Sequence, residues 1–361
     1  MKKFLTLAVI FSLALLCVGC KADNLVCEQK LMDYIEIDCK QAYMLSGEDK
    51  LVHVKIKPKA AGFSLSWSSD NEGVATVTDE GVITAVAAGK AKIVVKIVDT
   101  QYKSTCEVIV SDMAVSAQFT DSMQGFGVNK FNSFDSAIAA ADKGDTVMVY
   151  KGYYKCEGKI DKDISIVGDS GASVSGLSIS DNCNVYIDKL GIYVSDPAVG
   201  NGGIKIGRGC ILEMQACEII YDIKDEKGNN VIGNAGQEPE ASGESSSSNQ
   251  ESQIKIGTVT GVECNSDFKY IKLDGCKFSG QDIAIKIGAS TGFVSIRDNT
   301  ISSCKVGIDV DVRKEGNENI DMQGLIQGNI ISDTQLPTVF RYNGTLYSGT
   351  LKFEDYRPSA K

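Results

Sequence analysis

The pattern of hydrophobic and polar positions divides the chain into three parts. Residues 4–18 form one continuous apolar run. From about residue 34 to residue 110, short segments such as Ala91–Val98 alternate apolar and polar residues with a period of two, and turn-forming residues separate them. This alternation is typical of strands with one buried face, at the spacing of a β-sandwich. After residue 120, short apolar segments recur as a weak repeat.

The repeat has an aliphatic residue, two further residues, then Leu, Cys or Asn, one more residue, and an aliphatic or aromatic residue. It occurs at Ile187/Leu190/Ile192, Met214/Cys217/Ile219, Leu273/Cys276/Phe278, Ile296/Asn299/Ile301 and Ile326/Asn329/Ile331. A unit this small cannot bury its own apolar side chains, so neighbouring units must stack. We therefore predict an inward ladder of Cys217, Cys276, Asn299 and Asn329. In this ladder the Asn side chains bond backbone groups of adjacent rungs, and the Cys side chains fill the core.

A short helix precedes the repeat. Ser133 suits an N-cap, the following apolar residues up to Ala141 share one helical face, and Lys143-Gly144 ends the segment before the strand Thr146–Tyr150. This helix, the strand and the following Gly-Tyr-Tyr at 152–154 resemble the N-terminal cap of pectin-lyase-like β-helices. The resemblance implies a right-handed parallel β-helix whose open end is covered by the helix.

The segment from residue 34 to residue 112 resembles a bacterial Ig-like domain of group 2. The motifs that carry the resemblance are Leu65–Asp70, Val74–Val77, Gly81–Ala85, Gly89–Ala91 and Cys106–Val108. The resemblance implies a sandwich in which Trp67 anchors the core and Val74, Val77 and Val82 pack the two sheets together. It also implies a spacer or adhesion module without catalytic residues.

The predicted fold class is therefore all-β: an N-terminal Ig-like β-sandwich, then a right-handed parallel β-helix with an N-terminal capping helix. We expect a signal peptide at 1–19, a tether at 20–33, the Ig-like domain at 34–112 and the β-helix at 120–358. Residues 224–253 are polar and rich in Ser and Glu, without apolar periodicity. They are predicted to be a disordered insertion.

The N-terminus indicates export. Lys2 and Lys3 precede an apolar run that is short for a membrane span, and Gly19-Cys20 follows it. The end of the run resembles the lipobox of bacterial lipoproteins, which implies acylation of Cys20, although Cys17 stands where Leu is usual. Ordinary secretion with cleavage nearby is the alternative. We predict a membrane-anchored lipoprotein at the cell surface or the periplasmic face, which contacts the membrane through its lipid.

The composition of the chain argues against nucleic-acid binding and against a zinc site. The formal net charge of −10 repels a phosphate backbone, so we expect no nucleic-acid partner. No CxxC spacing is present among the cysteines after residue 20, so the sequence predicts no zinc site. Cys27, Cys39 and Cys106 could pair among themselves, and the sequence leaves this open.

One face of the predicted β-helix carries aligned charges. If Val262, Ile285 and Ile308 point inward, alternation points a set of charged residues outward. This possible ligand-binding face comprises Glu263, Lys286, Asp309 and Asp311. Asp309 and Asp311 could act as the carboxylate pair of an inverting glycosidase, or could bind Ca²⁺ with help from elsewhere. A cross-rung ladder of alternating charges is the simpler interpretation, because it requires no substrate.

The sequence identifies no catalytic residues. The only His is His53, in the Ig-like segment, which excludes Ser–His triads and the Gly-His-Gly element of polygalacturonases from the β-helix. The active-site motifs of pectinesterases are not matched, and Gln281-Asp282-Ile283 only faintly echoes one of them. The weak candidates for a lyase or hydrolase are Asp309, Asp311, Lys286 and Arg313.

The leading functional hypothesis is a surface-displayed, non-catalytic binding or adhesion lipoprotein with an extracellular or envelope glycan as ligand and no required cofactor. Two alternatives stay open. One is a polysaccharide lyase or glycoside hydrolase acting on uronate-rich glycans, and the other is a structural envelope protein. Fold resemblance alone does not decide between them.

Overall fold

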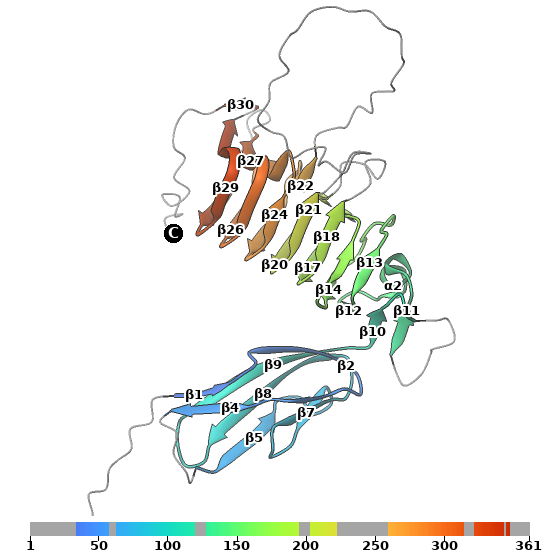
Figure 1. Cartoon of the computed structure of the whole chain (residues 1–361), viewed down its shortest axis with the longest axis vertical. Helices are drawn as coiled ribbons and strands as arrows, with labels where there is room; N and C mark the ends of the chain where they lie inside the picture. Colours follow the sequence, from blue (N-terminus) through green and yellow to red (C-terminus); the bar gives the residue numbers. More distant parts are fainter. Residues whose placement is uncertain are drawn as a thin grey trace, which may run out of the picture.

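The computed structural model describes residues 34–57, 63–119, 128–194, 203–221, 259–313, 321–342 and 344–346. The expected signal peptide, Cys20, Cys27 and the expected insertion at 224–253 lie outside the described residues. The described chain forms two units, an Ig-like sandwich and a stack of parallel strands (Figure 1).

The sandwich is built from three sheets. One is four-stranded, in the order β2 (Gln41–Leu45), β9 (Lys103–Ser111), β8 (Gly89–Ile97), β5 (Leu65–Ser69). The others are β3 (Asp49–Leu51), β7 (Val82–Ala85), β6 (Ala75–Val77) and the pair β1 (Tyr34–Ile37), β4 (Val54–Lys57). Among the described strands of the sandwich, β2 and β9 run parallel and the other pairs are antiparallel. The predicted Ig-like sandwich is confirmed.

The sandwich core follows the alternation in the sequence, with one error. Trp67 and Val77 are half-buried and pack against the core, and Val74 is buried. The prediction that Val82 packs between the sheets is wrong. In β7 the inward positions are Ile83 and Ala85, so the two-residue period places Val82 on the opposite, half-exposed face.

The second unit is a parallel β-helix whose first face is a nine-stranded sheet. Its strands, in spatial order, are β11 (Asn129–Phe131), β10 (Met113–Val115), β12 (Thr146–Val149), β14 (Ile164–Gly168), β17 (Asn184–Asp188), β20 (Ile211–Gln215), β23 (Tyr270–Asp274), β26 (Thr291–Arg297) and β28 (Asp321–Gln327). Every neighbouring pair is parallel.

Two further faces complete each rung. The second consists of β13 (Gly152–Tyr154), β15 (Ala172–Val174), β18 (Gly191–Val194), β21 (Glu218–Tyr221) and β24 (Lys277–Ser279). The third consists of β16 (Leu177–Ile179), β19 (Ile204–Ile206), β22 (Thr260–Cys264) and β25 (Ile283–Ala289).

Two long strands, β27 (Thr300–Val312) and β29 (Ile330–Tyr342), run through both of these faces and join them into one sheet. A short strand, β30 (Thr345–Leu346), pairs antiparallel with β29. Parallel crossovers of this type are right-handed in nearly all proteins.

The repeat positions stack in register, as predicted. Ile187 pairs with Met214, and Met214 with Leu273, while Ile192 pairs with Ile219 on the next face. All of these side chains belong to one continuous core that runs along the coil. Each rung therefore covers the apolar side chains of its neighbours, which is the stacking that the spacing requires.

The turn between the first two faces contains the predicted ladder. The Asn299 amide donates to the Leu273 carbonyl at 3.0 Å and to Asn329 Oδ1 at 2.9 Å, and Asn299 Oδ1 accepts from the Cys276 N–H at 2.8 Å. Asn299 and Cys276 are fully buried. One side chain thus connects three rungs through hydrogen bonds to buried polar groups.

The capping helix is also confirmed. The side chain of Ser133 accepts from the Ser136 N–H at the start of α2 (Phe134–Ala140), and Phe134 is completely buried. Lys162 Nζ donates to the Ala141 carbonyl at 2.9 Å, which places a cation at the helix C-terminus. The helix lies at the N-terminal end of the coil, beside β11 and β12 (Figure 1).

The two units are joined by a single residue. β9 ends at Ser111 and β10 begins at Met113, so the coil starts ahead of the predicted boundary at residue 120. Ser111 is 1% exposed, and its hydroxyl donates to the Thr146 carbonyl at 2.6 Å. The last strand of the sandwich thus leads directly into the first face of the coil through Asp112.

We predict that Asn299→Ala lowers the free energy of unfolding by about 2–4 kcal/mol, because it leaves the buried Cys276 N–H without a partner and removes the bonds to the Leu273 carbonyl and to Asn329. Urea unfolding followed by circular dichroism measures this change. Asn129→Ala, at an exposed position of β11, is the matched control and is expected to behave as wild type. Equal unfolding midpoints for the two variants would show that the ladder does not hold the rungs.

Candidate functional site

The predicted outward face lies on the third face of the coil, with its charges in register. Glu263 pairs with Lys286, and Lys286 with Asp309, on successive strands, and Lys205 precedes them opposite Glu263. Lys286 Nζ lies 3.1 Å from Glu263 Oε1. The signs therefore alternate along the stack, which places opposite charges next to each other at the spacing between rungs.

Asp309 is covered by an arginine from the following rung. Arg341 Nε donates to both of its carboxylate oxygens, at 3.0 and 3.4 Å, and the Asp309 side chain is only 8% exposed. Asp309 points out of the coil, but it is not accessible as a free carboxylate. We did not predict this partner, because Arg341 reaches Asp309 diagonally from the position opposite Asp311.

Asp311 and Arg313 pair with each other. Arg313 Nε lies 3.2 Å from Asp311 Oδ2, and the Gly344 N–H donates to Asp311 Oδ1 at 2.9 Å. Arg313 lies over Gly288, where a Cβ atom would come within 2.7 Å of its guanidinium. The absence of a side chain at Gly288 is what lets the guanidinium occupy this place.

The neighbouring polar and charged groups lower the pKa of Glu263 on this face. Burial alone would raise the pKa of Glu263, but the Asn265 amide, 2.8 Å away, and the Lys286 ammonium outweigh it and lower the pKa. Glu263 is therefore an anion at neutral pH. A general acid needs the opposite shift, so Glu263 is not poised to donate a proton.

These contacts determine what the face can do chemically. Each of the three carboxylates has a cationic partner, and none is left free as a nucleophile or base. Among the described residues, no cluster of three or more acidic, His or Cys side chains could hold a metal ion. Gln281 is buried and donates to the Ile219 carbonyl, and Asp282 pairs with Lys305, so this segment has structural contacts.

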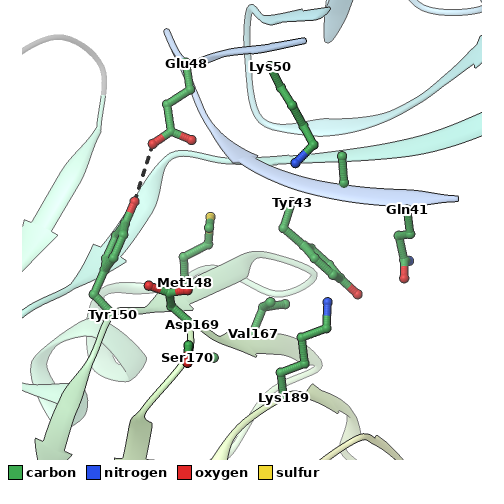
Figure 2. Close-up of a pocket in the computed structure, with 12 residues that line it drawn as sticks. Gln41, Tyr43, Glu48, Lys50, Met148, Tyr150, Val167, Asp169, Ser170 and Lys189 are labelled. Carbon is green, nitrogen blue, oxygen red and sulfur yellow. Dashed lines mark hydrogen bonds between the residues drawn. The ribbon is translucent and has the colours of Figure 1, made fainter. Parts of the chain in front are cut away.

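A cleft of about 630 Å³ lies where the sandwich meets the first rungs of the coil. Figure 2 shows Tyr43, Glu48 and Lys50 on the sandwich side, facing Tyr150, Asp169 and Lys189 on the coil side. The coil residues belong to β12 and β14 or directly follow β12, β14 and β17 on the nine-stranded face. No sequence pattern predicted this site, because its two walls are brought together only by the junction at Asp112.

Contacts across the cleft hold its walls together. The Tyr43 and Tyr186 hydroxyls lie 3.3 Å apart, and the Tyr150 hydroxyl donates to Glu48 Oε1 at 3.5 Å. Lys189 Nζ lies 5.3 Å from the centre of the Tyr43 ring. Burial, and next the Glu48 carboxylate, raise the pKa of Tyr150 to about 12, so the phenol is a hydrogen-bond donor at physiological pH.

Fold and sites together define a two-domain all-β protein. Comparison with known families identifies the first domain: residues 32–108 match the bacterial Ig-like domain (group 2). No curated protein matches the chain. Domains of this family occur in extracellular and surface proteins of bacteria. In the part of the chain that the structure describes, no helix is long and apolar enough to span a membrane.

The cysteines of the sandwich are free thiols. Burial, and next the neighbouring Cys39, raise the pKa of Cys106 to about 12. The two thiols are therefore near neighbours, while Cys27 lies outside the described residues.

The lowered pKa of Glu263 predicts how the stability of the fold depends on pH. Its ion pair stabilises the fold above the ordinary value of 4.5, and this contribution is lost as the pH falls through the lower folded pKa. We expect Glu263→Gln to be less stable than wild type by up to about 1 kcal/mol at neutral pH, and equally stable in acid. Urea unfolding of both proteins across this range measures the difference.

The matched control is Glu157→Gln, because the Glu157 side chain is 67% exposed in its pair with Lys155. Its stability should follow wild type at every pH. A Glu263→Gln deficit that stays undiminished at a pH well below the lowered folded pKa would contradict the assignment.

Proposed function

We propose that this protein is a surface-displayed, non-catalytic binding or adhesion protein with a glycan as its ligand. The single observation that carries the proposal is an Ig-like domain of a surface-protein family joined directly to a parallel β-helix. The β-helix presents long regular faces, and the one-residue junction limits how they can move relative to the sandwich. Such faces suit recognition of an extended ligand.

The pairing of charges supports a non-catalytic role. A glycosidase needs two carboxyl groups that reach the scissile bond, and a lyase needs an accessible base. Asp309 is covered by Arg341, and Asp311 is held by Arg313 and the Gly344 N–H. These contacts favour the charge ladder over the catalytic interpretation of the same residues.

Export and lipidation complete the proposal. Lys2, Lys3, the apolar run and Gly19-Cys20 support a lipid anchor on Cys20. The lipid would hold the protein on a membrane, with the Ig-like domain as a spacer and the β-helix furthest along the chain.

Incubation of the purified full chain with polygalacturonate, with and without Ca²⁺, tests for catalysis. We expect no unsaturated product absorbing in the ultraviolet and no new reducing ends. Asp309→Asn is the matched variant. Turnover by wild type that disappears in this variant would overturn the non-catalytic role.

A glycan array probed with the same full chain tests the binding proposal. We expect wild type and Asp309→Asn to bind the same glycans, because the carboxylate is already covered by Arg341. An array on which wild type binds no glycan would overturn the proposal and leave a structural envelope role.

The anchor has its own test. Cells expressing wild type should incorporate radiolabelled palmitate into the protein, and Cys20→Ser should abolish the label and release the chain from the membrane fraction. Labelling that persists in Cys20→Ser would contradict the proposed anchor.

A further inference from the structure

We infer that the cleft between the Ig-like sandwich and the first rungs of the β-helix binds an uncharged saccharide. This inference rests on the proposed function, because it takes a glycan as the ligand class and names its site and its charge. The predicted outward face is a different place on the molecule, on the third face of the coil.

The cleft is preformed. Its volume of about 630 Å³ lies in the range of small-molecule sites, and its two walls come from different domains. Asp112 alone separates the domains, and Ser111 bonds across the junction to Thr146. The walls of the cleft therefore lose little conformational entropy when a ligand binds, which favours binding.

The lining suits a sugar. Tyr43 and Tyr150 offer ring surface together with hydroxyl groups, a combination that serves ligands with both apolar and polar parts. A sugar ring has the same character, with C–H groups on its faces and hydroxyls at its edge. Lys50 and Asp169 add polar groups at the rim of the same cleft (Figure 2).

The cleft has equal numbers of positive and negative side chains, and some of them form no ion pair with a described residue. Two carboxylates, Glu48 and Asp169, face two ammonium groups, Lys50 and Lys189. Within the described residues neither Lys50 nor Asp169 forms an ion pair, unlike the carboxylates of the outward face. Balanced charge gives no net attraction for a polyuronate, whereas free donors and acceptors suit neutral hydroxyl groups.

A buried carboxylate lies beside the cleft and next to two of its lining residues. Asp188 is 2% exposed, and its Oδ1 atom has no hydrogen-bond partner among the described residues. Its other oxygen lies 3.7 Å from Lys189 Nζ, and Lys189 lines the cleft. Burial, with smaller contributions from Tyr186 and Asp188, raises the pKa of Tyr43, so this phenol stays protonated and can donate a hydrogen bond to a ligand in the cleft.

Isothermal titration of the purified full chain with oligosaccharides tests the inference. The probes are neutral gluco-, manno- and galacto-oligosaccharides, with oligogalacturonate as the acidic probe. We expect wild type to bind at least one neutral probe and Tyr150→Ala to bind it at least about tenfold more weakly. Tyr150→Phe keeps the ring and should retain most of the affinity, which separates loss of the ring from loss of the bond to Glu48.

A second pair of variants avoids the domain contacts. Lys50→Ala/Asp169→Ala removes two exposed rim groups and should weaken binding by about tenfold. Asp79→Ala/Lys92→Ala makes the same changes at exposed positions of the sandwich that do not line the cleft, and should bind as wild type. Thermal unfolding of each variant confirms that it is folded.

The outcomes separate the two proposals. Neutral-sugar binding that is unchanged in Tyr150→Ala and in Lys50→Ala/Asp169→Ala would overturn the cleft as the site and leave glycan binding intact. Binding of the acidic probe alone would overturn the uncharged ligand. No binding of any glycan by wild type would overturn the proposed function, and the cleft assignment with it.

Discussion

The structure depends on one constraint: a rung of the coil is too thin to bury its own apolar side chains. Ile187, Met214 and Leu273 become solvent-free only because they lie above one another on parallel strands. The backbone hydrogen bonds between rungs fix this register, and the α2 helix covers one end of the column. Outward side chains are then also stacked, so each is surrounded by the corresponding residues of adjacent rungs.

This constraint explains what the sequence could predict. The length of one rung sets the spacing of the repeat, so the spacing in the sequence predicts which residues pair on neighbouring strands. The residues of the repeat that pair in this way are Ile187, Met214, Leu273, Ile296 and Ile326. The buried role of Asn299 follows as well, because a polar residue at a core turn must satisfy its amide locally. The alignment of Glu263, Lys286 and Asp309 depends on the same register.

Other features depend on contacts that spacing does not encode. Arg341 covers Asp309 diagonally, through a long side chain whose direction alternation cannot give. Val82 and Ile83 are both aliphatic, so composition did not show which of them faces the core. The cleft joins Tyr43 to Tyr150 across two domains, and only the direct passage from β9 to β10 brings them together. Each of these depends on three-dimensional placement that a local pattern does not contain.

Native-state hydrogen exchange tests the stacking most directly, because it reports the stability of each strand separately. The account predicts that amides of the interior strands β17, β20 and β23 are the most protected in the chain and lose protection together as urea rises, since each rung covers the next. Interior strands that exchange as fast as the exposed turns, or one rung at a time with unrelated free energies, would contradict it.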